Sequence, residues 1–144
     1  MNLVIDASVL IKFYFPEILS DKAEELLTKV EQGDVMLLAP DLIYPEVGNI
    51  LWKKQQMKEL TRSEVEEITD AFVLLPLKIE ASKLLLPLAM DIGIAYRITV
   101  YDAIYVSMAR IYEIKMITAD RKLADVMAKT DLKEYVSWLG SPKW

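Results

Sequence analysis

The chain of 144 residues contains neither cysteine nor histidine, which excludes disulfides, thiolate catalysis, zinc sites built from these residues and the Ser-His-Asp triad. Its 53% hydrophobic content suffices for one globular domain with a substantial core, and its net charge of −5 argues against a general polyanion binder. The four glycines lie too far apart for a phosphate loop or a dinucleotide-binding motif.

The N-terminal part of the chain predicts two strands separated by helices. An apolar run over residues 3–5 leads directly into Asp6 and reads as a buried strand. A short helix is expected over residues 7–14, followed by an amphipathic helix over residues 20–33. Residues 35–39 predict the second strand.

Three helices are expected in the middle of the chain. The first covers about residues 41–56 and has Pro45 in its first turn. The second begins at residues 61–64, which have the spacing of a capping box. The third covers residues 81–92 and should be kinked by Pro87.

The C-terminal third predicts helices over residues 102–112 and 121–128 and strands over residues 115–118 and 135–139. Strands that alternate with helices form a mainly parallel sheet covered on both faces. We therefore expect one α/β domain over residues 1–144, with a central, mainly parallel sheet of about five short strands.

The N-terminus shows no signal-peptide pattern, because an acidic residue interrupts its only apolar stretch. The longest uncharged runs are shorter than the ~18 residues needed to span a bilayer. We expect a soluble protein of the cytoplasm that does not bind membranes.

Four acidic residues occupy positions suited to chemistry. Asp6 and Asp120 each follow a predicted strand, and open α/β sheets bind ligands outside the carboxyl ends of their strands. Glu46 shares a helix face with Asn49, and Asp102 begins a helix whose dipole favours the ionised form. Because no histidine can activate water, a divalent metal is the obvious substitute.

Each acid also has a structural explanation when taken alone. Asp102 and Asp120 are suited to cap helices, and Glu46 alone reads as a solvated helix residue. Asp6 is harder to explain in this way, because an acid that ends an apolar strand seldom serves packing.

Four short motifs occur in order at suitable separations: Asp6-Ala7-Ser8, Glu46-Val47-Gly48-Asn49, Tyr101-Asp102-Ala103 and Thr118-Ala119-Asp120. On these motifs the sequence closely resembles PIN-domain ribonucleases, particularly the VapC-like toxins of prokaryotic toxin–antitoxin pairs. The likeness extends over nearly the whole chain, to about residue 139. It implies a metal-dependent endoribonuclease whose catalytic, metal-binding acids are Asp6, Glu46, Asp102 and Asp120, with accessory polar residues at Ser8, Asn49 and Thr118.

The chemistry of such a site is consistent with one or two Mg²⁺ or Mn²⁺ ions. Four converging carboxylates repel one another, and hard cations with oxygen ligands would neutralise them. A metal-bound water would serve as nucleophile. Asp6 and Asp120 are expected to be direct ligands, whereas Glu46 and Asp102 bind directly or through water.

Basic residues suggest where an RNA substrate is held. The candidate RNA contacts come after Glu46 or directly after Asp120 in the sequence: Lys53, Lys54, Lys58, Arg62 and Arg121. They are expected to contact phosphates. The alternative is a solvated helix end whose cations complement its dipole.

The resemblance further implies a cognate antitoxin and a homodimer. Apolar residues around Leu51, Trp52 and Phe72 offer a groove for an amphipathic helix, and the acidic pocket is suited to an inserted arginine. The alternative role of these apolar residues is the domain core or the dimer interface.

Two other functions remain open from the sequence. A phosphate-handling receiver domain also has acids at strand ends, but it needs paired acids after its first strand, where Ala7 follows Asp6. A catalytically silent PIN-like module that binds RNA or protein would have no need to keep four self-repelling acids.

Overall fold

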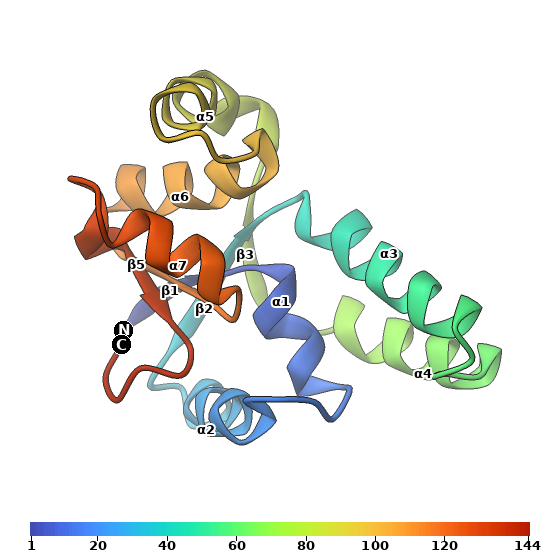
Figure 1. Ribbon diagram of the computed structural model, residues 1–144. Coiled ribbons are helices and arrows are strands. Elements are labelled where there is room, and N and C mark those ends of the chain that lie inside the picture. The colour runs from blue at the N-terminus through green and yellow to red at the C-terminus, as the bar shows by residue number, and fades with distance from the viewer.

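Five parallel strands form the central sheet of the computed structural model, which describes residues 1–144 (Figure 1). Their order across the sheet is β3-β2-β1-β4-β5, and each neighbouring pair is parallel. The strands are β1 (Asn2–Ile5), β2 (Met36–Pro40), β3 (Leu77–Glu80), β4 (Lys115–Thr118) and β5 (Val136–Trp138).

Helices cover both faces of this sheet. In Figure 1, α5 and α6 lie on one side and α2 on the other. The helices are α1 (Ala7–Leu10), α2 (Ser20–Glu31), α3 (Ile43–Gln56), α4 (Arg62–Val73), α5 (Ser82–Tyr96), α6 (Val100–Tyr112) and α7 (Arg121–Met127), with 3-10 turns η1 (Ile11–Phe13) and η2 (Lys133–Tyr135). The predicted α/β class with a parallel sheet is confirmed.

The burial of the central elements explains their composition. Three successive residues of β1 and of β4 are buried, because a strand in the middle of a doubly covered sheet is apolar on both faces. Helix α6 is buried continuously from Ala103 to Ala109 and packs against β1, β2 and β4. It is therefore the central helix of the core.

One strand, β3, was not predicted. It pairs with β2 at the edge of the sheet, and none of its four residues is fully buried. It includes Lys78 and Glu80, so it lacks the apolar run by which the other strands are recognised.

Helix α2 begins at Ser20, as expected, whereas the starts of α3 and α6 differ from the expected ones. Leu19, with φ 70°, precedes α2, and Ser20 Oγ does not cap the helix but accepts a hydrogen bond from the backbone N–H of Glu17 at 2.8 Å. Asp41 does not cap α3, because its carboxylate accepts from the N–H of Ser82 at 3.0 Å. Helix α6 begins before Asp102.

The cap of α6 is Thr99. Its hydroxyl accepts a hydrogen bond from the backbone N–H of Asp102 at 3.2 Å. The side chain of Asp102 is therefore not used in capping. The predicted capping box of Thr61 and Glu64 at the start of α4 is confirmed.

The strand order places the topological switch point between β1 and β4. The chain leaves β1 towards β2 on one side, while β4 pairs with β1 on the other side, with Ile5 opposite Ile117. Open α/β sheets bind ligands in the crevice at such a point. Asp6 and Asp120 follow these two strands directly or nearly so.

The same order bears on the receiver-domain alternative. A receiver domain has the strand order 2-1-3-4-5. The order found here, 3-2-1-4-5, is different. The fold therefore counts against that alternative.

No single helix is both long and apolar enough to cross a membrane. Helices α5 and α6 meet the criteria of length and composition only as a pair, and they are bent by 115° at the break between them.

Candidate active site

Asp6 is the most buried of the four predicted acids, at 7% exposure. It caps α1: Oδ1 accepts hydrogen bonds from the backbone N–H of Val9 at 3.2 Å and from Ser8 Oγ at 2.5 Å. Oδ2 accepts from Thr118 Oγ1 at 2.5 Å. Burial raises the pKa of Asp6 to about 6, although these three hydrogen bonds oppose it.

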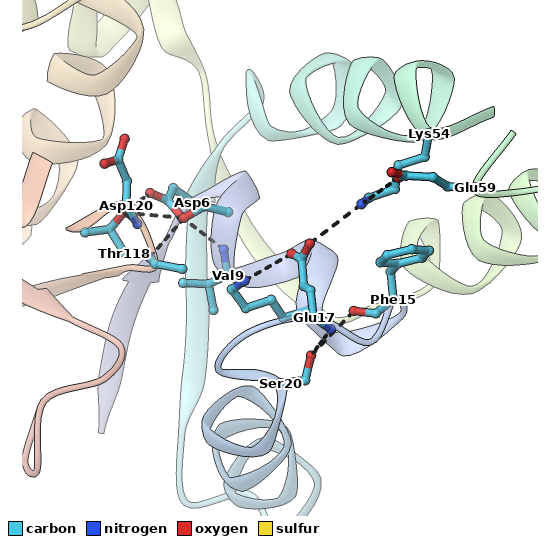
Figure 2. Close-up of polar contacts among 12 residues, drawn as sticks. Asp6, Val9, Phe15, Glu17, Ser20, Lys54, Glu59, Thr118 and Asp120 are labelled. Carbon is cyan, nitrogen blue, oxygen red and sulfur yellow. Dashed lines mark hydrogen bonds and ion pairs between the residues drawn. The ribbon is translucent and has the colours of Figure 1, made fainter. Parts of the chain in front are cut away.

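The hydroxyls of Ser8 and Thr118 connect the ends of β1 and β4. Each also accepts a backbone N–H, Ser8 from Ala119 at 2.9 Å and Thr118 from Asp120 at 3.1 Å. Figure 2 shows Asp6, Thr118 and Asp120 together at this edge of the sheet. Both oxygens of Asp6 are thereby fixed in direction.

Glu46 lies in the first turn of α3 and is half-buried. Its Oε1 accepts a hydrogen bond from the hydroxyl of Tyr105 at 2.6 Å, and this is the only polar contact of its side chain. Burial raises the pKa of Glu46, and the charge of Asp102 raises it further. Burial and the neighbouring Glu46 raise the pKa of Tyr105 as well, so its hydroxyl remains a donor.

Asn49 makes no hydrogen bond to any of the four acids. Its side chain is exposed on α3, where it lines a hollow of about 330 Å³ together with Glu46 and Tyr101. The orienting role expected for Asn49 therefore has no contact to support it.

Asp102 and Asp120 line a second hollow, of about 240 Å³. Asp102 is half-buried in the first turn of α6, and burial followed by the charge of Asp120 raises its pKa. Asp120 is exposed and caps α7, accepting the backbone N–H of Leu123 at 3.1 Å. Asp120 is thus both a helix cap and a neighbour of Asp102.

Asp102 couples the four carboxylates electrostatically. Its charge raises the pKa of Asp6 and of Glu46, and the charge of Asp120 raises that of Asp102. The sequence predicts such repulsion, but burial is the larger cause in all three groups.

The donors at this site are carboxylate and hydroxyl oxygens, and the chemistry of this set fits a hard divalent cation. No three of the acids, however, lie close enough together to hold one ion. The oxygen ligands of the four acids suit a divalent cation, and the side chains would have to move closer together for three of them to coordinate the same ion.

Lys54, one of the predicted RNA contacts, is bound to acidic partners at the far end of α3 (Figure 2). Its ammonium lies 3.6 Å from carboxylate oxygens of Glu17 and Glu59 and 3.8 Å from the ring centroid of Phe15. With a side chain only 14% exposed, Lys54 contributes to packing between α3 and the segment before α2.

The other predicted cations are exposed. Arg62 pairs with Glu66 at 3.3 Å, and Arg121 pairs with Asp125 at 3.0 Å. Lys53 and Lys58 form no ion pair.

Arg97 is a residue that the sequence analysis missed. It ends α5 in the left-handed conformation, with φ 57°, and lines the hollow of Asp102 and Asp120 together with Lys122. Neither cation forms an ion pair. The only sequence signal is a cation in the short segment before α6, which says little until the fold places it beside the acids.

A parallel sheet with neighbouring carboxylates at its switch point is typical of a class of α/β proteins, and comparison with known families identifies that class. The PIN domain family matches residues 3–129, and the chain belongs to this family. Among curated relatives it is similar to Ribonuclease VapC3 of Pyrobaculum aerophilum, with 34% identity over 87% of this chain and 94% of that protein.

Solved structures share the fold at lower identity. PAE2754 from Pyrobaculum aerophilum superposes with a TM-score of 0.66 and 22% identity over 88% of this chain and 79% of that one. A toxin–antitoxin complex from Klebsiella pneumoniae contains a chain with a TM-score of 0.63 and 16% identity, over 94% and 95% of the two chains.

Proposed function

We propose that this PIN-domain protein is a metal-dependent endoribonuclease and the toxin of a toxin–antitoxin pair. The main support is the placement of four acids from four separate parts of the chain around the switch point of the sheet: two follow β1 and β4, and two lie in the first turns of α3 and α6. The 34% identity to a protein named as a ribonuclease supports the same activity. The reaction is hydrolysis of RNA phosphodiester bonds.

Asp6 and Asp120 are the proposed direct ligands, with Glu46 and Asp102 binding directly or through water. When bound, one or two Mg²⁺ or Mn²⁺ ions supply a water of lowered pKa and neutralise the acids. With a pKa of about 6, Asp6 is mostly ionised at neutral pH and available as a ligand. Ser8 and Thr118 hold its two oxygens in fixed directions.

We place the RNA backbone along the hollow beside Asp102 and Asp120. Arg97 and Lys122 line it and have no ion-pair partner, so their charges are free to contact phosphates. Arg121, next to Lys122, and the exposed Lys53, Lys58 and Arg62 are further candidate contacts. Lys54 is assigned to the fold instead, because its charge is already paired.

We propose that the antitoxin binds between α3 and α4. A hollow of about 360 Å³ there is lined by residues including Gly48, Trp52 and Val65, and Trp52 is 57% exposed. Such a groove suits the apolar face of an amphipathic helix, from which an arginine reaches the acids. Leu51 is buried but lines the floor of this hollow, whereas Phe72 is buried in the core and does not line it.

We place the homodimer contact on α5. On this helix Leu86, Met90 and Ile94, spaced four residues apart, form one face of exposed apolar side chains, Ile94 at 73%. An apolar helix face of this kind is typical of a protein interface.

RNA cleavage tests the proposed activity. We expect a structured RNA pool to be cut by wild type with Mg²⁺ or Mn²⁺ but not with EDTA, and Asp6→Asn or Asp120→Asn to lose most of the rate. Asp125→Asn, on the helix that Asp120 caps, is the control: it leaves the four acids intact and removes only the ion pair of Arg121, so it should retain cleavage. Equal cleavage by wild type and the Asp6 and Asp120 variants would contradict the proposal, and sequencing the product ends identifies the cleavage site.

A further inference from the structure

Tyr105 joins two of the elements that bear acids. It lies on α6 three residues after Asp102, so both side chains leave the helix on the same side. Its hydroxyl donates to Glu46 Oε1 on α3 at 2.6 Å, and the residue is 2% exposed. One part-buried hydrogen bond thus links α6, which carries Asp102, to Glu46 on α3.

Glu46 depends on this bond for its orientation. Its half-buried side chain has rotatable bonds and no other polar partner. A hydroxyl contacts one lone pair of Oε1 and leaves Oε2 free for a cation. Because the phenol is neutral, it orients the carboxylate without cancelling its charge. A lysine at the same place would cancel it.

A tyrosine hydroxyl can also bond a carboxylate for stability alone, and the half-buried Tyr112 of α6 is an example. The hydroxyl of Tyr112 donates to Glu80 Oε2, also at 2.6 Å. Glu80 ends the edge strand β3 and is not one of the four coupled acids. Tyr105 and Tyr112 therefore make the same bond on the same helix, and only Tyr105 makes it to a candidate metal ligand.

We propose that Tyr105 is a positioning residue, whose hydroxyl directs the carboxylate of Glu46 towards a divalent cation bound between α3, α6 and the carboxyl ends of β1 and β4. This inference rests on the proposed function, because it requires a metal there. It adds a residue outside the four acidic motifs to the working site.

The test compares Tyr105→Phe with Tyr112→Phe, since both variants lose one phenol–carboxylate hydrogen bond. Titration calorimetry with Mn²⁺ should give about 10-fold weaker binding for Tyr105→Phe and unchanged binding for Tyr112→Phe. In RNA cleavage at saturating Mn²⁺, kcat of Tyr105→Phe should fall while KM for RNA stays constant. Thermal melts in EDTA measure the structural cost of each variant, which should be larger for the buried Tyr105 than for the half-buried Tyr112.

A double-mutant cycle with Glu46→Gln tests whether Tyr105 acts through Glu46. In that background Tyr105→Phe should have no further effect on Mn²⁺ affinity. The inference would be overturned if Tyr105→Phe bound Mn²⁺ as tightly as wild type, or if both tyrosine variants lost the same Mn²⁺ affinity. It would also be overturned if the affinity losses of Tyr105→Phe and Glu46→Gln were additive. If wild type does not bind Mn²⁺ at all, the proposed metal-dependent function is contradicted, and the positioning role of Tyr105 is contradicted with it.

Discussion

At the scale of single residues, Asp6 shows how burial and hydrogen bonding compete. Three donors favour its ionised form, namely Ser8, Thr118 and the backbone of Val9. Burial nevertheless dominates and raises its pKa to about 6. Without a cation, an ionised Asp6 therefore destabilises the folded protein relative to its protonated form.

This imbalance predicts a pH dependence of stability. The folded pKa of Asp6 is about 6 and its ordinary value 3.8, so the stabilising contribution of the protonated group is complete below about pH 4. It is lost as pH rises to 6 and above. In metal-free buffer, the free energy of unfolding of wild type should fall by about 3 kcal/mol relative to Asp6→Asn over this range.

Urea unfolding of both proteins between pH 4 and pH 7.5 measures this difference, and the raised pKa values of Glu46 and Asp102 affect both proteins similarly. A difference that stays constant, or that favours wild type as pH rises, would refute the assignment of Asp6 as a destabilising buried acid.

Residues of the site differ in how far the sequence predicts them. Asp6 is found from sequence because it directly follows an apolar run that predicts a strand, whereas Thr118 is identified only by the resemblance to PIN-domain ribonucleases. Tyr105 and Arg97 are not found, because their relevance depends on packing. Tyr105 lies within an apolar helix and reads as an ordinary core residue until the fold places Glu46 of α3 at its hydroxyl.

At the scale of elements, the far end of α3 is fixed to the segment before α2. Lys54 contacts Glu17 of that segment and Glu59 after α3, and it lies over the ring of Phe15 (Figure 2). Glu17 also pairs with Lys12 at 3.0 Å. This network holds the helix that carries Glu46 in place from its opposite end.

Lys54→Gln and Lys53→Gln separate this structural role from RNA binding. Because the side chain of Lys54 is largely buried against its partners, its loss should lower the free energy of unfolding by about 1 kcal/mol. Lys53 is exposed and unpaired, so its loss should leave stability nearly unchanged. Urea unfolding checks both values, and KM for RNA at low salt checks binding. An unchanged stability and a raised KM in Lys54→Gln would show that the lysine serves the substrate.

Element boundaries were predictable where local chemistry decides them. The capping box before α4 follows from residue spacing alone. The start of α3 does not, because Asp41 is engaged by Ser82, which is distant in sequence. Strand β3 was missed because an edge strand needs no apolar run.

At the scale of the whole molecule, the strand order turns scattered acids into neighbours. The crossing of the chain from β3 to β4 places Asp120 beside Asp6, more than a hundred residues earlier. Helices α3 and α6 then bring Glu46 and Asp102 to the same edge. The central claim is that these four carboxylates act as one cation site.

Thermal melts of wild type and Asp120→Asn in EDTA, Mg²⁺ and Mn²⁺ test this claim most directly. Since Asn caps a helix about as well as Asp, the two proteins should melt alike in EDTA. At one hundred times its dissociation constant, the metal should stabilise wild type and the control Asp125→Asn by about 2.7 kcal/mol, and Asp120→Asn much less. Equal stabilisation of all three proteins would contradict the account, because Asp120 would then be a helix cap and nothing more.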